Sequence, residues 1–157
     1  MKLAIGCDNA GAPLLDVVRD VLKERGIEFE DYGVGPTDPT MYPDVARSVS
    51  EQVASGTVDR GILVCGTGIG MSITANKVPG VRAALVHDTY SAERAQLSND
   101  AQIITMGARV IGGEVGRKIV ETWLDAQYID NERSGPKVKR MIEIDEEYRG
   151  KMEAAGE

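Results

Sequence analysis

Short apolar runs alternate along this sequence with segments whose apolar residues recur at helical spacing. The run at residues 3–7 is followed by Leu14, Val18 and Leu22, which share one helical face, and Gly26 ends that segment. The alternation continues, and the predicted strands are residues 3–7, 28–32, 60–64, 81–86 and 101–106. Strands that alternate with helices are typical of a parallel sheet covered on both faces. We therefore predict an α/β fold with a five-stranded parallel sheet.

The predicted helices lie between and after these strands. They cover residues 14–22, 44–55, a short stretch from 70 to about 78, then 89–97, 114–128 and 134–149. The last helix is charged and has only a narrow apolar stripe, so we expect it to pack on a partner subunit rather than on its own core. A chain of 157 residues suits one domain. We assign residues 1–150 to that domain and expect 151–157 to be a frayed tail.

Charge and composition exclude several classes of protein. The formal net charge of −7 and the aromatic content of 4% argue against nucleic-acid partners and membrane surfaces. There is neither an apolar stretch near membrane-spanning length nor an export leader. The two cysteines, Cys7 and Cys65, form no CxxC motif and pair with no histidine, so we expect no metal site. These features predict a cytoplasmic protein with reduced thiols.

Cys65 ends one apolar run and opens a glycine-rich loop at residues 65–70. Gly66, Gly68 and Gly70 would let the backbone approach a ligand closely. If a helix begins after them, its free N–H groups would favour an anion and the thiolate form of Cys65. The alternative is a small buried residue that ends a strand, since free cysteine is among the most buried residue types.

Better-known glycine motifs do not fit this loop. A P-loop needs a lysine directly after its glycines, and the first lysine here is Lys77. A dinucleotide fingerprint follows the first strand, whereas this loop follows the third. A Cys-x5-Arg phosphatase loop would need arginine at position 71, which is Met71. What remains is a cysteine followed by backbone donors, to which Thr67 adds a hydroxyl group.

Ligands of a doubly wound sheet bind outside the carboxyl ends of its strands. This rule brings together the loops at residues 7–11, 65–70 and 87–88, and possible further contacts come from 106–109. Asp8 could act as a general base, bind hydroxyl groups or cap the following helix. His87, the single histidine, could contact a substrate or be a solvated loop residue.

Five short segments carry a specific resemblance. They are Gly6–Gly11, Tyr42–Asp44, Cys65–Lys77, Ser98–Ala101 and Gly107–Gly112. Together they resemble the ribose-5-phosphate isomerase B family, which includes galactose-6-phosphate isomerase subunits and tetrose-phosphate isomerases, and the match covers about residues 1–145. The resemblance implies a Rossmann-like three-layer sandwich, a homodimer or homotetramer with sites shared between subunits, and no cofactor. It also implies interconversion of an aldose phosphate and its ketose.

The same resemblance implies a role for each matching position. Cys65 would be the catalytic base that moves a proton between C1 and C2, Thr67 and the loop N–H groups would stabilise the enediolate, and Asp8 would hold substrate hydroxyls. The implied substrate-binding residues are Asn9, Tyr42, Gly66, Gly68, Gly70, Asn76, Ser98 and Asn99. The implied phosphate-binding residues are Arg109, Arg133 and Lys137.

Three positions depart from the ribose-phosphate enzymes of that family. Asn9 and Ser98 each replace a histidine, and Lys137 replaces an arginine. The histidine replaced by Ser98 is assigned to opening the sugar ring, which a serine cannot do near neutral pH. A tetrose 4-phosphate has no free 4-hydroxyl and forms no furanose ring. The sequence therefore favours D-erythrulose 4-phosphate and D-erythrose 4-phosphate as substrates, and it resembles the tetrose-phosphate branch of the family.

Two alternatives stay open at this point. One is isomerisation of ribose 5-phosphate and ribulose 5-phosphate by the same chemistry. The other, from a different class, is a non-catalytic module that binds sugar phosphates, and the retained Cys65 and Thr67 argue against it.

Overall fold

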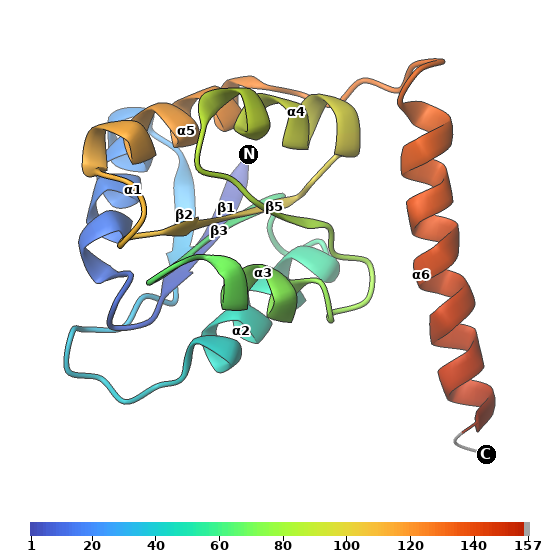
Figure 1. Cartoon of the computed structure of the whole chain (residues 1–157), viewed down its shortest axis with the longest axis horizontal. Helices are drawn as coiled ribbons and strands as arrows, with labels where there is room; N and C mark the ends of the chain where they lie inside the picture. Colours follow the sequence, from blue (N-terminus) through green and yellow to red (C-terminus); the bar gives the residue numbers. More distant parts are fainter. Residues whose placement is uncertain (156–157) are drawn as a thin grey trace.

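The computed structural model describes residues 1–155 and contains five strands and six helices in that range (Figure 1). The strands are β1 (Lys2–Cys7), β2 (Glu28–Asp31), β3 (Arg60–Cys65), β4 (Ala83–Leu85) and β5 (Ile103–Gly107). The helices are α1 (Ala12–Glu24), α2 (Tyr42–Ala54), α3 (Ile69–Ala75), α4 (Thr89–Asn99), α5 (Gly113–Asp125) and α6 (Gly135–Ala155). All strand pairs are parallel, in the order β2-β1-β3-β5-β4. The predicted α/β fold with a five-stranded parallel sheet is confirmed.

Several observed elements are shorter than the sequence suggested, among them β4 and α5. β4 begins at Ala83 because the N–H of Arg82 donates to the side chain of Gln102 instead of continuing the ladder. α5 ends at Asp125, where Ala126 turns to an extended conformation. The guanidinium group of Arg60 donates to the carbonyl oxygens of Trp123 and Ala126, each at 2.9 Å, and so satisfies backbone acceptors at this helix end.

Helices cover both faces of the sheet (Figure 1). α1, α4 and α5 pack on one face and α2 and α3 on the other. Side chains of β3 alternate between the two layers, so that Val64 faces α1 whereas Leu63 and Cys65 face α2 and α3. Cys7, at the end of β1, belongs to the α1 layer. The two thiols therefore lie in opposite layers, and both are free.

The chain reverses its direction of winding between β1 and β3, which are neighbours in the sheet. β1 leads into α1 on one face and β3 leads into α3 on the other, which opens a crevice at the carboxyl ends of both strands. A side chain at Gly11 would collide with the carbonyl group of Val64. The loop after β1 therefore lies directly against the end of β3, where Cys65 is found.

α6 stands beside the α/β body and is joined to it by residues 126–134 (Figure 1). One anchor is the N–H of Gly80, which donates to the Asp145 carboxylate at 2.7 Å. The apolar residues of α6 with large exposed fractions are Met141, Ile142, Ile144, Tyr148 and Met152. Packing of this helix on a partner subunit stays a prediction. The frayed tail predicted over 151–157 begins inside α6, and its last two residues lie outside the described part of the chain.

Between residues 1 and 155, no helix combines the length and the apolar character that crossing a bilayer requires.

Candidate active site

A cleft of about 500 Å³ opens at the carboxyl ends of β1 and β3. Its lining residues are Asp8, Asn9, Ala10, Tyr42, Cys65, Gly66, Thr67, Ile69, Gly70, Ile73 and Arg109. Eight of these match positions to which the sequence assigned a role: Asp8, Asn9, Tyr42, Cys65, Gly66, Thr67, Gly70 and Arg109. The structure therefore brings together residues that are up to 101 positions apart along the chain, from Asp8 to Arg109.

The sulfur of Cys65 lies at the floor of this cleft. Cys65 is 5% exposed, and the N–H of Gly68 donates to its Sγ at 3.1 Å. Gly68 adopts the left-handed conformation with φ of 77°, which glycine reaches without strain. The Gly68 N–H is therefore aimed at the sulfur of the residue that the sequence analysis assigned as the base.

The glycine loop presents several unpaired N–H groups. Gly68 donates to Cys65, and Ile69 donates to the hydroxyl oxygen of Thr67 at 3.3 Å. Over residues 1–155, the N–H groups of Gly66, Thr67 and Gly70 have no protein acceptor. Fixed donors of this kind stabilise negative charge that develops on a substrate oxygen, because they need no reorganisation during the reaction.

Asp8 does not cap α1, because the N-cap position is Gly11, where no side chain bonds to the helix N–H groups. The Oδ1 of Asp8 accepts the N–H of Gly11 at 3.0 Å, which fixes the turn into α1. Its Oδ2 has no hydrogen-bond partner in the part of the chain that the structure describes. Asp8 thus forms a local turn and also offers an acceptor to the cleft, where Asn9 lies beside it.

Tyr42 forms one wall of the cleft from the first turn of α2. Its ring packs directly on Gly70, where a Cβ atom would lie 2.5 Å from the ring carbons. Glycine at this position therefore lets an aromatic ring approach the loop closely. Ile69 and Ile73 from α3 add apolar side chains to the lining, and the sequence analysis missed both. In the sequence they are two apolar residues four positions apart, which share one face of a helix. In the structure that face is not buried, since the two side chains are 51% and 56% exposed.

Two arginines stand out by their lack of partners. Nine of the eleven arginines bind a carboxylate or a backbone carbonyl group. Arg109 and Arg133 are the two whose guanidinium groups have no such partner among residues 1–155. Both were assigned to phosphate binding, and an uncommitted guanidinium is available for that role.

Arg109 and Arg133 lie in different clefts of this chain. Arg109 lies beside the glycine loop, and its Nη1 is 3.4 Å from the position of a Cβ on Gly66. Arg133 lines a second cleft of about 290 Å³, together with Ser98 from α4. Lys137 is exposed on α6 and lines neither cleft. The structure therefore divides the predicted phosphate-binding residues between separate surfaces.

Three predicted substrate-binding residues have other positions. Gly68 lies beneath the loop, where its N–H bonds to Cys65, and Asn99 ends α4 without lining either cleft. The amide of Asn76 joins α3 to β4. Its Nδ2 donates to the carbonyl oxygens of Ser72 and Ala83 at 2.9 and 2.8 Å, and its Oδ1 accepts the N–H of Ala83 at 2.9 Å.

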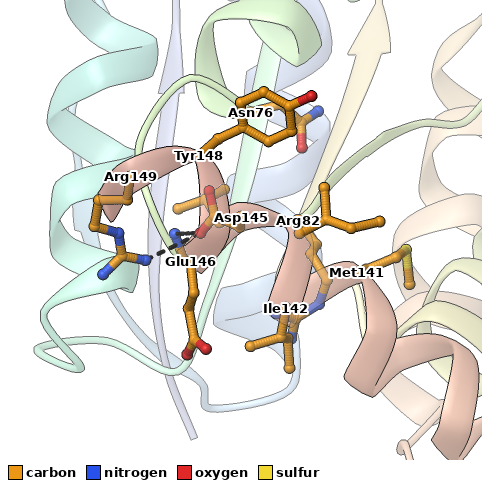
Figure 2. A pocket seen from close by; sticks show the side chains of 11 residues that line it. Asn76, Arg82, Met141, Ile142, Asp145, Glu146, Tyr148 and Arg149 are labelled. Atoms are coloured by element: carbon orange, nitrogen blue, oxygen red, sulfur yellow. Dashed lines mark hydrogen bonds and ion pairs between the residues drawn. The ribbon is translucent and has the colours of Figure 1, made fainter. Parts of the chain in front are cut away.

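Asn76 also lines a cavity of about 490 Å³ between the body and α6 (Figure 2). The two arginines of this cavity are paired within the chain. Arg149 binds Asp145 at 3.1 Å, as the dashed lines in Figure 2 show, and Arg82 binds Asp100 at 2.8 Å. A cavity whose arginines are committed in this way is a poor site for a phosphate group.

His87 lines neither the first nor the second cleft. Its Nε2 accepts the N–H of Gly107 at 3.0 Å, so the imidazole holds the end of β5. Burial lowers the pKa of His87, which keeps the ring neutral and able to accept this bond. Gly107 lies against the backbone of Thr67, where a Cβ would approach the Thr67 Cα to 2.7 Å. His87 therefore fixes Gly107, which in turn packs against Thr67 of the cleft.

Protonation of His87 should destabilise the fold. The pKa of the folded-state imidazole lies below the ordinary 6.5, so the unfolded chain binds more protons once the pH falls below that value. Stability should therefore drop as the pH falls from 6.5 toward the lowered pKa. We expect His87→Gln, which retains an acceptor but does not titrate, to show a smaller decrease in urea midpoint between about pH 7.5 and about pH 5.5. An equal decrease in both proteins would contradict this role.

Among the described residues 1–155, no group of three or more His, Cys, Asp or Glu side chains is arranged to hold a metal ion. Burial raises the pKa of Cys7, whose thiol faces the carbonyl oxygen of Val34 at 3.7 Å. Cys7 is therefore held as a neutral thiol, away from the cleft.

Comparisons with known proteins agree with this geometry. The family model described as Ribose/Galactose Isomerase matches residues 3–141. A protein of Listeria innocua named ribose-5-P isomerase B is 51% identical over 149 residues, which cover 95% of this chain and 100% of that protein. A protein of Pectobacterium atrosepticum named D-erythrulose-4-phosphate isomerase is 48% identical over 142 residues, which cover 90% and 93%.

The fold is similar to that of a solved relative. The structure of ribose-5-phosphate isomerase B from Clostridium thermocellum superposes with a TM-score of 0.89 and 44% sequence identity, over 94% of this chain and 99% of that one. The relatives are named as sugar-phosphate isomerases, which sets aside the interpretation of the chain as a non-catalytic module. The chain belongs to the ribose/galactose isomerase family and is a sugar-phosphate isomerase of the ribose-5-phosphate isomerase B type.

Proposed function

We propose that this enzyme interconverts D-erythrulose 4-phosphate and D-erythrose 4-phosphate, with Cys65 as the base. The observation that carries the proposal is the arrangement of one cleft. Cys65, the loop residues with unpaired N–H groups and Arg109, whose guanidinium is uncommitted, all line this cleft. This combination supplies a base, donors for a developing oxyanion and a cation for phosphate.

The proposed step starts from the open-chain ketose. The Cys65 thiolate removes a proton from C1, and the electrons of the broken C–H bond form a C1–C2 double bond while negative charge moves onto O2. The N–H groups of Gly66, Thr67 and Gly70 are proposed to stabilise this enediolate. The thiol then returns the proton to C2, and O1 gives up its proton as O2 gains one. No electron leaves the substrate, so the step needs no redox partner.

Ring opening is the argument for a four-carbon substrate. A furanose must be opened by an acid–base group before C1 and C2 can react, and imidazole is the side chain suited to this near neutral pH. This chain has one histidine, and its Nε2 is committed to Gly107. Ser98 occupies the position at which the resemblance places the ring-opening histidine, and it lies in the second cleft. A tetrose 4-phosphate arrives without a furanose ring and does not need the missing group.

Steady-state kinetics on both substrates test the proposal. We expect kcat/KM for D-erythrulose 4-phosphate to exceed that for D-ribose 5-phosphate at least about tenfold, because ring opening would limit the second reaction. A value for ribose 5-phosphate equal to or above that for the tetrulose phosphate would reject the tetrose assignment. It would favour the alternative, ribose 5-phosphate isomerisation. The names of the relatives include both activities.

We further propose that two subunits complete each site. Ser98 and Arg133 share the second cleft, away from Cys65. Ile69 and Ile73 in the first cleft are 51% and 56% exposed, and Met41, the neighbour of Tyr42 in the chain, is 67% exposed. Exposed apolar side chains of this kind are typical of a surface covered by another chain. In a homodimer, Arg133 of the partner subunit would approach the phosphate held by Arg109. This arrangement would supply two cations to one dianion.

Ser98→His should shift the substrate preference. An imidazole at this position restores an acid–base group that can open a furanose ring. We expect kcat/KM for ribose 5-phosphate to rise about tenfold or more in the variant, while the value for erythrulose 4-phosphate changes less than about threefold. Ser98→Asn, which has similar size but does not titrate, is the matched control. A gain of equal size in the asparagine variant would assign the effect to shape rather than to acid–base chemistry.

A further inference from the structure

We infer that Thr105 is a positioning residue that aims the Gly68 N–H at the sulfur of Cys65. The inference rests on the proposed role of Cys65 as the base. Thr105 lies on β5, is fully buried and does not line the cleft. Its Oγ1 donates to the carbonyl oxygen of Gly68 at 2.9 Å. Any effect on the reaction must therefore pass through Gly68.

The sheet places Thr105 and Cys65 on the same face. Ile103 packs in the α2 and α3 layer and Ile104 in the opposite layer, so the next residue, Thr105, points back toward α3. Cys65 belongs to that same layer. Within β3 and β5, Thr105 pairs with Leu63, two residues before Cys65. The hydroxyl thus lies beneath the loop that begins at Cys65.

Both peptide groups that flank the Cα of Gly68 make hydrogen bonds. Its N–H donates to Cys65 Sγ at 3.1 Å, and its carbonyl oxygen accepts from Thr105 and from the N–H of Ser72, at 2.9 and 3.0 Å. A side chain at position 68 would lie 2.7 Å from the backbone of Met106. Restraining the carbonyl leaves the N–H free to turn only through φ and ψ of Gly68, which limits its departure from the sulfur.

A purely structural need does not account for this hydroxyl. The Ser72 N–H already satisfies the Gly68 carbonyl in the first turn of α3. A strand buried on both faces favours aliphatic residues, and a buried hydroxyl is costly unless it is bonded. Among the five described strands, Thr105 is the one residue with a hydroxyl side chain. That hydroxyl bonds to the residue whose N–H contacts the sulfur.

The test compares Thr105→Val with Thr105→Ser. Valine keeps the shape and removes the hydroxyl, whereas serine keeps the hydroxyl and removes a methyl group. Ser50→Ala is the matched control, since Ser50 is also fully buried and its hydroxyl oxygen has no partner among the described residues. Two quantities are measured for each full-length protein: kcat and KM for D-erythrulose 4-phosphate, and the rate at which iodoacetamide alkylates the peptide that contains Cys65.

We expect Thr105→Val to lower kcat about three- to tenfold with KM within about twofold, as for the loss of one hydrogen bond. Its Cys65 alkylation should slow about threefold or more at about pH 7, because the loop N–H no longer points at the sulfur. Thr105→Ser and Ser50→Ala should behave as the wild type in both measurements.

Two outcomes would overturn the inference. One is an unchanged alkylation rate and kcat in Thr105→Val. The other is an equal decrease in Thr105→Val and Thr105→Ser, which would show that packing rather than the hydroxyl matters. Failure of the proposed function is recognised separately, because Cys65→Ala would then retain turnover. The alkylation measurement needs no turnover and reports on the loop alone.

Discussion

Cys65→Ala is expected to lower kcat about 100- to 10,000-fold, the range for losing a general base. The Gly68 N–H would lose its acceptor, but the remaining loop donors and Arg109 would still face the cleft. We therefore expect the affinity for D-erythrulose 4-phosphate, measured by calorimetry, to change less than about threefold. Turnover near the wild-type value would reject Cys65 as the base.

Cys7→Ala is the matched control for that substitution. Cys7 is also a free, buried cysteine at the end of a strand, but it lies in the α1 layer and lines neither cleft. We expect its kcat to stay within about twofold of the wild type. A large loss in both variants would indicate that any buried cavity near the sheet ends disturbs the site, and the assignment to Cys65 would lose its support.

Mixing two inactive arginine variants should restore activity. Arg109→Ala and Arg133→Ala should each lower kcat/KM about 100-fold or more, because each removes a charge-assisted contact to phosphate. The two residues lie in separate clefts of one chain, so we propose that each site takes Arg109 from one subunit and Arg133 from the other. A dimer with one chain of each kind then has one site that lacks both arginines and one intact site.

Co-expression of the two variants is the measurement. Random pairing makes half of the dimers mixed, with half of their sites intact, so we expect about one quarter of the wild-type activity. An Arg109→Ala, Arg133→Ala double variant co-expressed with Arg133→Ala is the control, since every site in that mixture lacks at least one arginine. Absence of any recovery in the first mixture would contradict the shared site.

The sequence predicted the sheet well because its signal is local and periodic. Residues 60–64 and 101–106 are apolar runs bounded by helical segments, and both are central strands. The prediction of β4 was too long, at residues 81–86, because the start of this strand depends on a hydrogen bond to a residue distant in the sequence. The N–H of Arg82 bonds to the Gln102 side chain, which no local pattern reveals. The start of α6 was placed within one residue, at 134 rather than Gly135.

The cleft was predictable because the carboxyl ends of parallel strands meet at one edge. This rule placed Asp8, Cys65 and Arg109 together. Residues that do not line the cleft but hydrogen-bond to the backbone around it were not predictable. His87 bonds to Gly107 and Thr105 bonds to Gly68, and these pairs are 20 and 37 positions apart. Their contacts follow from strand order and register, which the sequence alone does not specify.

Asn76 and Arg133 show two further limits of prediction from sequence. Asn76 was assigned to substrate binding, whereas its amide bonds to the backbone of Ser72 and Ala83, outside the cleft. Arg133 lies in the cleft that contains Ser98. Its relation to Cys65 depends on how two chains pack, and that is a property of the assembly rather than of one fold.

Deuterium transfer tests most directly whether Cys65 moves a proton within an open-chain tetrose phosphate. D-erythrulose 4-phosphate is incubated in D2O with the wild type or with Cys65→Ala, and the sugar phosphates are followed by proton NMR. A thiol that takes the C1 proton exchanges it with solvent, so we expect the wild type to form D-erythrose 4-phosphate that carries deuterium at C2. Cys65→Ala should label the sugar about 100-fold or more slowly than the wild type. Labelling at the wild-type rate by the alanine variant would contradict the account, as would an aldose formed entirely without deuterium.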